Sequence, residues 1–140
     1  MIEEIHIEQI RSDLTWRIRN EVMYPDKPVE YVKLENDTDG THFGLFANGY
    51  LTSVISLFNA SNIYQFRKFA TLVPAQGKGY GTKLLEYVIT YVKQRGGKKL
   101  WCNARLSAIA LYTKFGFVKT DQLFTRDGKE FVIMVLEISD

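Results

Sequence analysis

Alternating glycines are the feature of this sequence best suited to binding chemistry. Gly77, Gly79 and Gly81 lie between a strand-like segment that ends near Val73 and an amphipathic helical pattern that begins at Thr82. Glycine lets backbone N–H groups approach a ligand without an intervening Cβ atom. The start of a helix adds N–H donors without partners and a partial positive charge. Together these features predict a cradle for a phosphate or pyrophosphate group.

The spacing of the glycines excludes two common nucleotide-binding loops. A Walker A loop requires Gly-x4-Gly-Lys-Ser/Thr, and the dinucleotide-binding fingerprint requires Gly-x-Gly-x-x-Gly. Neither pattern occurs, because the third glycine comes one residue too early for the fingerprint. A glycine-rich segment can also be a simple turn, but the position between a strand and a helix favours phosphate binding.

The cysteine and the histidines give little support for metal or thiol chemistry. Cys102 is the only cysteine, so no intramolecular disulfide can form. His6 and His42 are widely separated, so no metal site is expected. Cys102 could act as a nucleophile, but it lies in a short apolar segment beside Trp101. Free cysteines in such segments behave mostly as small buried hydrophobic residues.

The length and composition fit one soluble domain over residues 1–140. The chain has 46% apolar residues, 24% charged residues and a net charge of +2. Its lysines and arginines are scattered, so no nucleic-acid partner is expected. The acidic N-terminus lacks an apolar signal core, and the longest apolar runs are far too short to span a bilayer. We therefore expect a cytoplasmic protein with no membrane partner.

The first third of the chain is expected to contain a strand, a helix and a long connection. Isoleucines at positions 2, 5 and 7 predict a short first strand, and apolar periodicity predicts a helix over residues 9–24. Pro25 and Pro28 close this helix. Residues 25–41 then form a long polar connection rich in Asp and Glu, and long ordered loops in small domains are often functional.

The remainder is expected to form a β-meander followed by alternating strands and helices. Asn48-Gly49 is a strong signal for a type I′ hairpin, and Gly96-Gly97 supplies a helix stop. This order predicts an α/β fold with a mixed sheet and helices on its faces. The expected strands are 42–47, 50–58, 63–73, 99–104, 117–118 and 131–138, with Asp127-Gly128 as a turn, and the expected helices begin at Thr82 and span 107–115, with Ser107 as N-cap.

Two motifs give the chain a resemblance to a known family. Residues 76–81, Gln-Gly-Lys-Gly-Tyr-Gly, match the Gln/Arg-x-x-Gly-x-Gly/Ala signature of the GNAT superfamily of N-acetyltransferases. Residues 110–117, Ala-Leu-Tyr-Thr-Lys-Phe-Gly-Phe, resemble the family's second signature, a helix end followed by a strand. Recognisable similarity covers about Phe66 to Val118. The resemblance implies a mostly antiparallel, twisted central sheet of six to seven strands flanked by helices.

The resemblance implies acetyl-CoA as co-substrate, with its pyrophosphate on the glycine loop. Backbone groups of the strand before the loop would hold the pantetheine arm and polarise the thioester carbonyl, because fixed dipoles stabilise the charge that develops there. Asn103 would bond the CoA arm or simply cap its strand, and Lys78 and Lys114 would meet phosphates or be solvated. The implied cofactor-binding residues are Phe69, Ala70, Thr71, Gln76, Gly77, Lys78, Gly79, Tyr80, Gly81, Thr82 and Asn103.

Tyr112 matches the position where many family members place the general acid. This group would return a proton to the departing CoA thiolate. A phenol suits the task because its pKa near 10 keeps it protonated at neutral pH, above that of a thiol at about 8.5. In the alternative interpretation, Tyr112 is a helix residue that packs against the sheet.

The implied reaction is direct transfer of an acetyl group to the primary amine of an unidentified small-molecule or peptide acceptor. A non-catalytic CoA-binding sensor or assembly module is the alternative. The general base is open, because the strand 63–69 holds no carboxylate. The acidic stretch 26–39 could supply one or attract a cationic amine, or be a solvated loop. Antibiotics, polyamines, amino acids, protein N-termini and lysine side chains all remain candidate acceptors, and family members often form homodimers.

Overall fold

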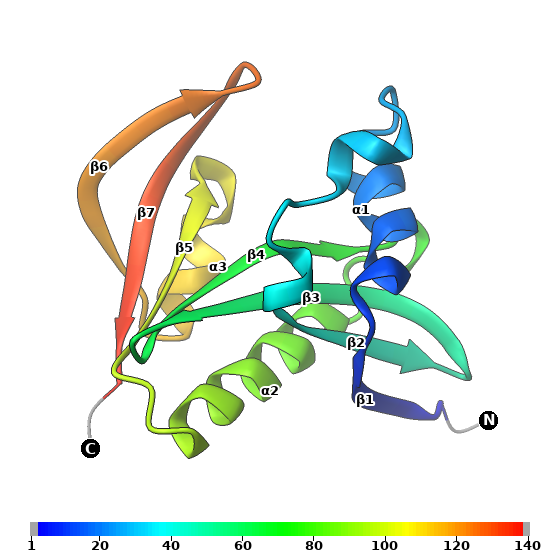
Figure 1. Ribbon diagram of the computed structural model, residues 1–140, viewed down its shortest axis with the longest axis horizontal. Helices are drawn as coiled ribbons and strands as arrows, with labels where there is room; N and C mark the ends of the chain where they lie inside the picture. Colours follow the sequence, from blue (N-terminus) through cyan, green and yellow to red (C-terminus); the bar gives the residue numbers. More distant parts are fainter. Residues whose placement is uncertain (1–2, 139–140) are drawn as a thin grey trace.

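A twisted sheet of seven strands organises the protein, which a computed structural model describes over residues 3–138 (Figure 1). The strand order is β1-β2-β3-β4-β5-β7-β6, and all neighbours are antiparallel except β4 and β5. This confirms the prediction of a mixed, mostly antiparallel sheet flanked by helices. The strands are β1 (Ile5–Ile10), β2 (Thr41–Ala47), β3 (Tyr50–Ala60), β4 (Ile63–Thr71), β5 (Lys99–Arg105), β6 (Val118–Arg126) and β7 (Lys129–Glu137).

Helices on the two faces of the sheet divide the apolar core into two parts. The larger core joins α2 and α3 to the sheet, and Phe66 and Cys102 belong to it; we call this side the α2 face. The smaller core joins α1 to the sheet through Ile18, Val54 and Ala70; we call this side the α1 face. The helices are α1 (Trp16–Met23), α2 (Tyr80–Gln94) and α3 (Ile109–Lys114). Within residues 3–138, no helix is long and apolar enough to cross a membrane.

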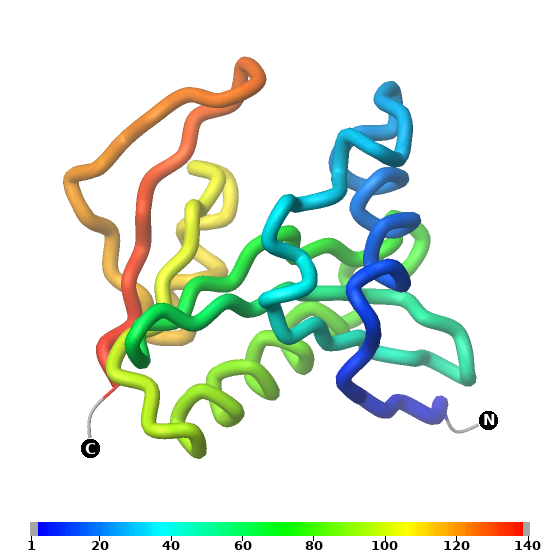
Figure 2. Tube along the Cα trace, in the orientation of Figure 1, coloured from blue at the N-terminus to red at the C-terminus, as the bar shows by residue number. Residues whose placement is uncertain are grey.

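β4 and β5 pair over only three residues and then diverge. The pairing ends at Gln65 and Trp101, and Figure 2 shows the two strands separating beyond this point. A bulge contributes to the divergence, because Lys68 has a φ of 54° and adds a residue to β4 opposite Ile55. Beyond the paired segment, β4 bonds only to β3 and β5 only to β7. Two strand edges therefore face each other across a cleft without pairing.

The expected hairpin at Asn48-Gly49 is confirmed. Both residues have positive φ angles, 51° and 85°, as a type I′ turn requires. The helix predicted over residues 9–24 is wrong at its start. Gln9 and Ile10 continue β1, where they pair with β2, and α1 begins only at Trp16 after a 3-10 turn. Pairing across the sheet and burial of Ile10 outweigh the helical periodicity.

Smaller departures from the predicted elements occur in the second half. α2 begins at Tyr80, two residues before the predicted Thr82. Ser107 is not an N-cap, because a 3-10 turn over Leu106–Ala108 precedes α3 and Ala108 holds the cap position without a side-chain hydrogen bond. β6 runs well past Val118, because β7 supplies a long antiparallel partner.

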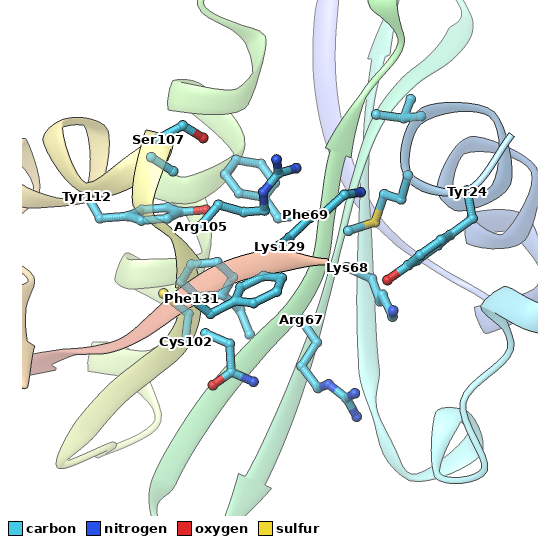
Figure 3. A pocket seen from close by; sticks show the side chains of 15 residues that line it. Tyr24, Arg67, Lys68, Phe69, Cys102, Arg105, Ser107, Tyr112, Lys129 and Phe131 are labelled. Atoms are coloured by element: carbon cyan, nitrogen blue, oxygen red, sulfur yellow. The ribbon is translucent and has the colours of Figure 1, made fainter. Parts of the chain in front are cut away.

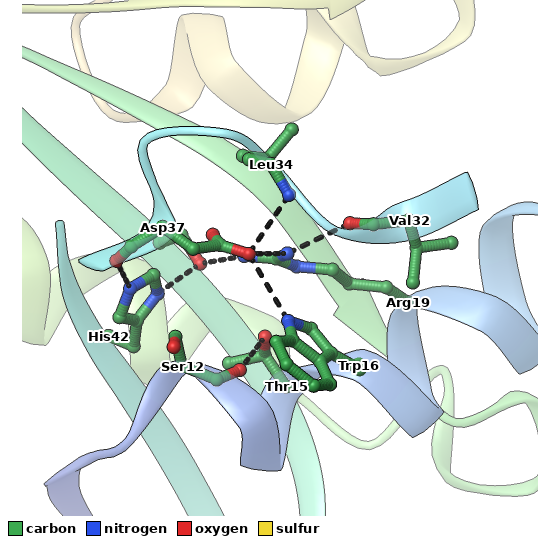
Figure 4. A network of polar contacts seen from close by, with 9 residues as sticks. Ser12, Thr15, Trp16, Arg19, Val32, Leu34, Asp37 and His42 are labelled. Carbon is green, nitrogen blue, oxygen red and sulfur yellow. Dashed lines mark hydrogen bonds and ion pairs between the residues drawn. The ribbon is translucent and has the colours of Figure 1, made fainter. Parts of the chain in front are cut away.

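A buried ion pair anchors the long connection between α1 and β2 (Figure 4). Arg19 is fully buried and donates two hydrogen bonds to Asp37, each 3.0 Å. Arg19 also donates to Val32 O at 2.9 Å and to Ser56 Oγ at 2.8 Å. Burial would raise the pKa of Asp37, but hydrogen bonds from Arg19 and the Leu34 N–H hold it below its usual 3.8. Asp37 is therefore a structural carboxylate.

We expect Asp37→Ala to lower the free energy of unfolding by about 3–5 kcal/mol, because it leaves a buried guanidinium without its partner. Urea denaturation measures the loss. The double variant Arg19→Met/Asp37→Leu removes both charges and should recover most of it. Equal stability of Asp37→Ala and the natural protein would contradict an anchoring role for this ion pair.

Candidate active site

The cleft between β4 and β5 is the candidate active site (Figure 3). It encloses about 280 Å³ and receives side chains from α1, β4, β5, α3 and β7. Tyr112 enters it from the α3 side and Tyr24 from the α1 side, and both hydroxyl groups point toward the middle. Because the strands diverge within the sheet, the cleft connects the α2 face with the α1 face.

Tyr112 lies in apolar surroundings on the α2 face. Its side chain is only 9% exposed, and its ring packs on Phe66 and Phe117 with centroids 5.6 and 5.8 Å apart. Burial, followed by the nearby Cys102, raises the pKa of the phenol above its ordinary value of 10. No hydrogen bond to the hydroxyl is found among residues 3–138, so it is free to meet a ligand in the cleft.

Cys102 lines the same part of the cleft. Burial raises the pKa of its thiol to about 12. At neutral pH the side chain therefore stays protonated, and a thiol is a much weaker nucleophile than a thiolate. These surroundings suit the small buried hydrophobic residue that the sequence predicted.

The glycine loop presents a run of free backbone donors. The first backbone N–H of α2 that makes a helical hydrogen bond is that of Lys83, which donates to Gly79 O at 3.1 Å. In the described part of the chain, the six N–H groups from Gly77 to Thr82 have no partner. Gly77 and Gly79 have φ angles of 82° and 85°, and no protein atom lies within 4 Å of an added Cβ. The loop therefore offers open space, free donors and the positive end of a helix.

The end of β4 adjoins the glycine loop. A Cβ on Gly81 would lie 3.3 Å from the Phe69 ring and 3.5 Å from Thr71 Oγ1. Gln76 closes the junction by donating from Nε2 to Thr71 O at 2.9 Å. Ala70 points to the α1 face, where it is buried beneath α1. The residues of β4 after Gln65, Phe69 to Thr71 among them, have no partner strand on the side that faces β5.

The other predicted site residues have different surroundings. Tyr80 is only 3% exposed, and its hydroxyl donates to Glu3, so only its backbone faces the loop. Lys78 and Thr82 are exposed. Asn103 lines the cleft on the α1 face, opposite Ile133 of β7, and thus on the other face of the sheet from Tyr112.

The sequence analysis did not identify a group of cations around the cleft. The cleft is lined by Arg67, Lys68, Arg105 and Lys129. A smaller pocket adjoins it and is lined by Arg126 together with Arg67 and Lys68. Their one sequence signal is the pair Arg67-Lys68, two charges in an otherwise uncharged strand. The carboxylates of the 26–39 stretch do not line either pocket.

Burial, followed by the like charges of Arg67 and other arginines, lowers the pKa of Lys68 from its ordinary 10.5 to about 8. Between these two values the unfolded chain binds more protons than the folded chain. The free energy of unfolding should therefore rise with pH across this window.

We expect the stability gained by Lys68→Met to be largest below pH 8 and to shrink toward pH 10.5, because the variant lacks this titration. Urea denaturation at several pH values measures the difference from the natural protein. Lys93→Met on the exposed side of α2 is the control for the substitution itself. Identical pH profiles for the two variants would contradict the lowered pKa.

The chain belongs to the GNAT family of acetyltransferases. The family model described as "Acetyltransferase (GNAT) domain" matches residues 14–138. This match confirms the family resemblance carried by the two sequence motifs.

Relatives with assigned names are also N-acetyltransferases. The chain is 26% identical over 133 residues to YitI of Bacillus subtilis (strain 168), an uncharacterized N-acetyltransferase, with 89% of each chain covered. It is 40% identical over 72 residues to the [Ribosomal protein bS18]-alanine N-acetyltransferase of Escherichia coli (strain K12). That alignment spans 46% of this chain and about half, 49%, of the relative.

Solved structures share the fold. The ribosomal-protein-S18-alanine N-acetyltransferase from Escherichia coli has a TM-score of 0.81 and 23% identity, with 98% of this chain and 96% of that chain covered. A GNAT acetyltransferase from Elizabethkingia anophelis with acetyl-CoA bound has a TM-score of 0.74 and 19% identity, covering 96% and 97%. A Bacillus subtilis acetyltransferase in complex with CoA has a TM-score of 0.71 and 20% identity, covering 99% and 100%.

Proposed function

We propose that the protein transfers an acetyl group from acetyl-CoA directly to the primary amine of a small-molecule or peptide acceptor. The observation that carries this proposal is the run of six free N–H groups over Gly77–Thr82, next to the open cleft. Such a cradle suits the CoA pyrophosphate. Family membership and the two CoA-bound structures of similar fold support acetyl-CoA as co-substrate. In this proposal, residues 1–140 form a single GNAT-like domain.

The pantetheine arm and thioester would occupy the cleft between the strand edges. The unpaired edge of β4 from Phe66 to Thr71 offers backbone donors and acceptors to the amides of the arm. A backbone N–H of this edge near Thr71 would polarise the thioester carbonyl. Because the strand fixes its dipoles in advance, the donor stabilises the developing oxyanion with little rearrangement.

Tyr112 would donate a proton to the sulfur as the C–S bond breaks. The raised pKa of this phenol keeps it protonated throughout the neutral range. A thiolate leaving into the same apolar surroundings also becomes more basic, as the pKa of about 12 for the neighbouring Cys102 illustrates. Burial therefore raises the pKa of the proton donor and of the acceptor sulfur in the same direction.

Direct transfer fits the cleft better than an acetyl-cysteine intermediate. Cys102 is the only cysteine of the chain. Its raised pKa leaves very little thiolate at neutral pH to attack the thioester. The amine would then attack the acetyl carbon itself.

We expect acetyl-CoA at about 100 times its dissociation constant to stabilise the protein by roughly 2.7 kcal/mol in thermal unfolding. Gly79→Glu should abolish this gain, because its carboxylate enters the phosphate cradle. Gly49→Glu is a matched control, since Gly49 has the same φ of 85° and equally open surroundings in the β2–β3 hairpin. Stabilisation that survives in Gly79→Glu would move the cofactor away from the glycine loop.

We expect Tyr112→Phe to lower turnover about 100-fold or more, the usual contribution of a general acid, with little change in acetyl-CoA affinity. Release of the CoA thiol measures turnover, and the thermal shift reports affinity. Tyr64→Phe, another buried tyrosine of the same core, controls for loss of a hydroxyl. Unchanged turnover in Tyr112→Phe would remove this residue from the mechanism. If the natural protein binds acetyl-CoA but releases no CoA thiol with any amine tested, the result would favour a non-catalytic CoA-binding module.

A further inference from the structure

Strand register gathers the cleft cations on the α1 face. Arg67 lies opposite Ser56, whose hydroxyl accepts a hydrogen bond from Arg19 of α1. Side chains directly opposite in an antiparallel pair share a face. In β5, Cys102 and Ala104 point to the α2 face, so Arg105 points to the α1 face. Arg105 lies opposite Phe131 of β7, which therefore points to the α1 face as well. Lys129, two residues from Phe131, therefore shares that face, and so does its own partner Arg126.

The cations converge from different strands. Lys68 of β4 and Lys129 of β7 both approach the Tyr24 ring, with Nζ atoms 5.2 and 5.4 Å from its centroid. Arg67 and Lys68 also line an adjoining pocket with Arg126. Figure 3 shows Lys68 beside Tyr24 and Arg67 projecting on its own side of the cleft. The charges are thus concentrated at one mouth of the cleft.

Little negative charge offsets this cluster. Among residues 3–138, no Asp or Glu lines either of these two pockets, and the carboxylates of Asp26 and Asp127 line a neighbouring one with Lys129. Within residues 3–138, none of the five cations forms an ion pair. Asp127 lies near Lys68 and offsets part of the charge, while it accepts hydrogen bonds from Tyr24 at 3.1 Å and Tyr31 at 3.3 Å. Partly buried like charges without partners oppose folding, and a bound anion would compensate them.

The cofactor does not account for these charges. In the proposed function, the CoA pyrophosphate lies on the glycine loop. That loop adjoins Phe69, which packs on the core of the α2 face. The cations project from the α1 face, so they are available to the acceptor.

We propose that the acceptor is a small primary amine that also carries a carboxylate or phosphate group, bound by Arg67 and Lys68 with Arg126 at the rim. This proposal rests on the proposed acetyl transfer. Guanidinium groups form paired, charge-assisted hydrogen bonds to both kinds of anion. A polyamine or another polycationic acceptor would instead be repelled.

The same charges ease the reaction of the amine. Cations that the acceptor's anion leaves unpaired, such as Lys129 and Arg105, disfavour the ammonium form, so the bound amine gives up one proton to solvent more readily, without a carboxylate base. Its nitrogen then bonds to the acetyl carbon and the C–S bond breaks. The thiolate takes the Tyr112 proton, and Tyr112 regains the second proton that the nitrogen loses on becoming an amide.

CoA release from matched amine pairs tests the proposal. Small L-amino acids are compared with their amides, and phosphoethanolamine with ethanolamine. We expect kcat/KM to be about 10- to 100-fold higher for the anionic member of at least one pair, the range for a charge-assisted hydrogen-bonded pair. The two arms distinguish a carboxylate from a phosphate. Equal or better use of the neutral members would overturn the proposal.

Variants separate the anion site from the rest of the enzyme. Arg67→Gln should remove the preference for anionic amines and leave the acetyl-CoA thermal shift unchanged. Arg126→Gln, at an exposed strand end, should weaken the preference even if Arg67→Gln folds poorly. Lys93→Gln makes the same change in net charge on the exposed side of α2 and should leave the preference intact. A preference that persists in both arginine variants would place the anion elsewhere.

A binding measurement covers the case in which no tested amine is acetylated. With CoA saturating, inorganic phosphate should raise the unfolding temperature of the natural protein but not of Arg67→Gln. An equal effect of phosphate on both proteins, or none on either, would overturn the anion site. Failure of acetyl-CoA itself to bind would instead overturn the proposed function.

Discussion

The divergence of β4 and β5 is the constraint on which the rest of the structure depends. Within residues 3–138, the two strands form the only parallel pair of the sheet; they pair over three residues, and the bulge at Lys68 follows further along β4. A bulge sacrifices local pairing and changes the course of its strand. In this sheet, the loss of pairing leaves backbone groups of β4 and β5 free along a cleft. Tyr112 enters the cleft that this divergence opens.

The divergence also connects two chemically different faces. On the α2 face, Tyr112 and Cys102 lie in apolar surroundings that raise the pKa of both groups. On the α1 face, Arg67 and Lys68 lie among further cations, and burial lowers the pKa of both. One cleft thus has a neutral end suited to a thioester and a cationic end suited to an anion. The buried pair Arg19–Asp37 holds the connection that begins after Tyr24, a residue of the cationic end.

Local and non-local features differ in how far the sequence predicts them. The glycine loop depends on a short contiguous stretch, so its donors and the start of α2 could be inferred within two residues. Hairpin turns and the order of strands were likewise local. The helix boundary at Ile10 was missed, because β1 is defined by a partner more than thirty residues away. The cation cluster was missed for the same reason: its members come from β4, β5, β6 and β7, and only strand register brings them together.

The fold also gives the acidic connection, residues 26–39, a different role from the one expected from the sequence. The sequence of residues 26–39 favours a general base or an attraction for a cationic amine. In the fold, Asp37 neutralises Arg19, and no carboxylate of that stretch lines the two pockets between β4 and β5. The charge that lines these two pockets is therefore opposite in sign to that expected from the linear chain. In the proposed reaction, cations near the amine would serve the same end as a carboxylate base, since both favour the neutral amine that would attack the thioester.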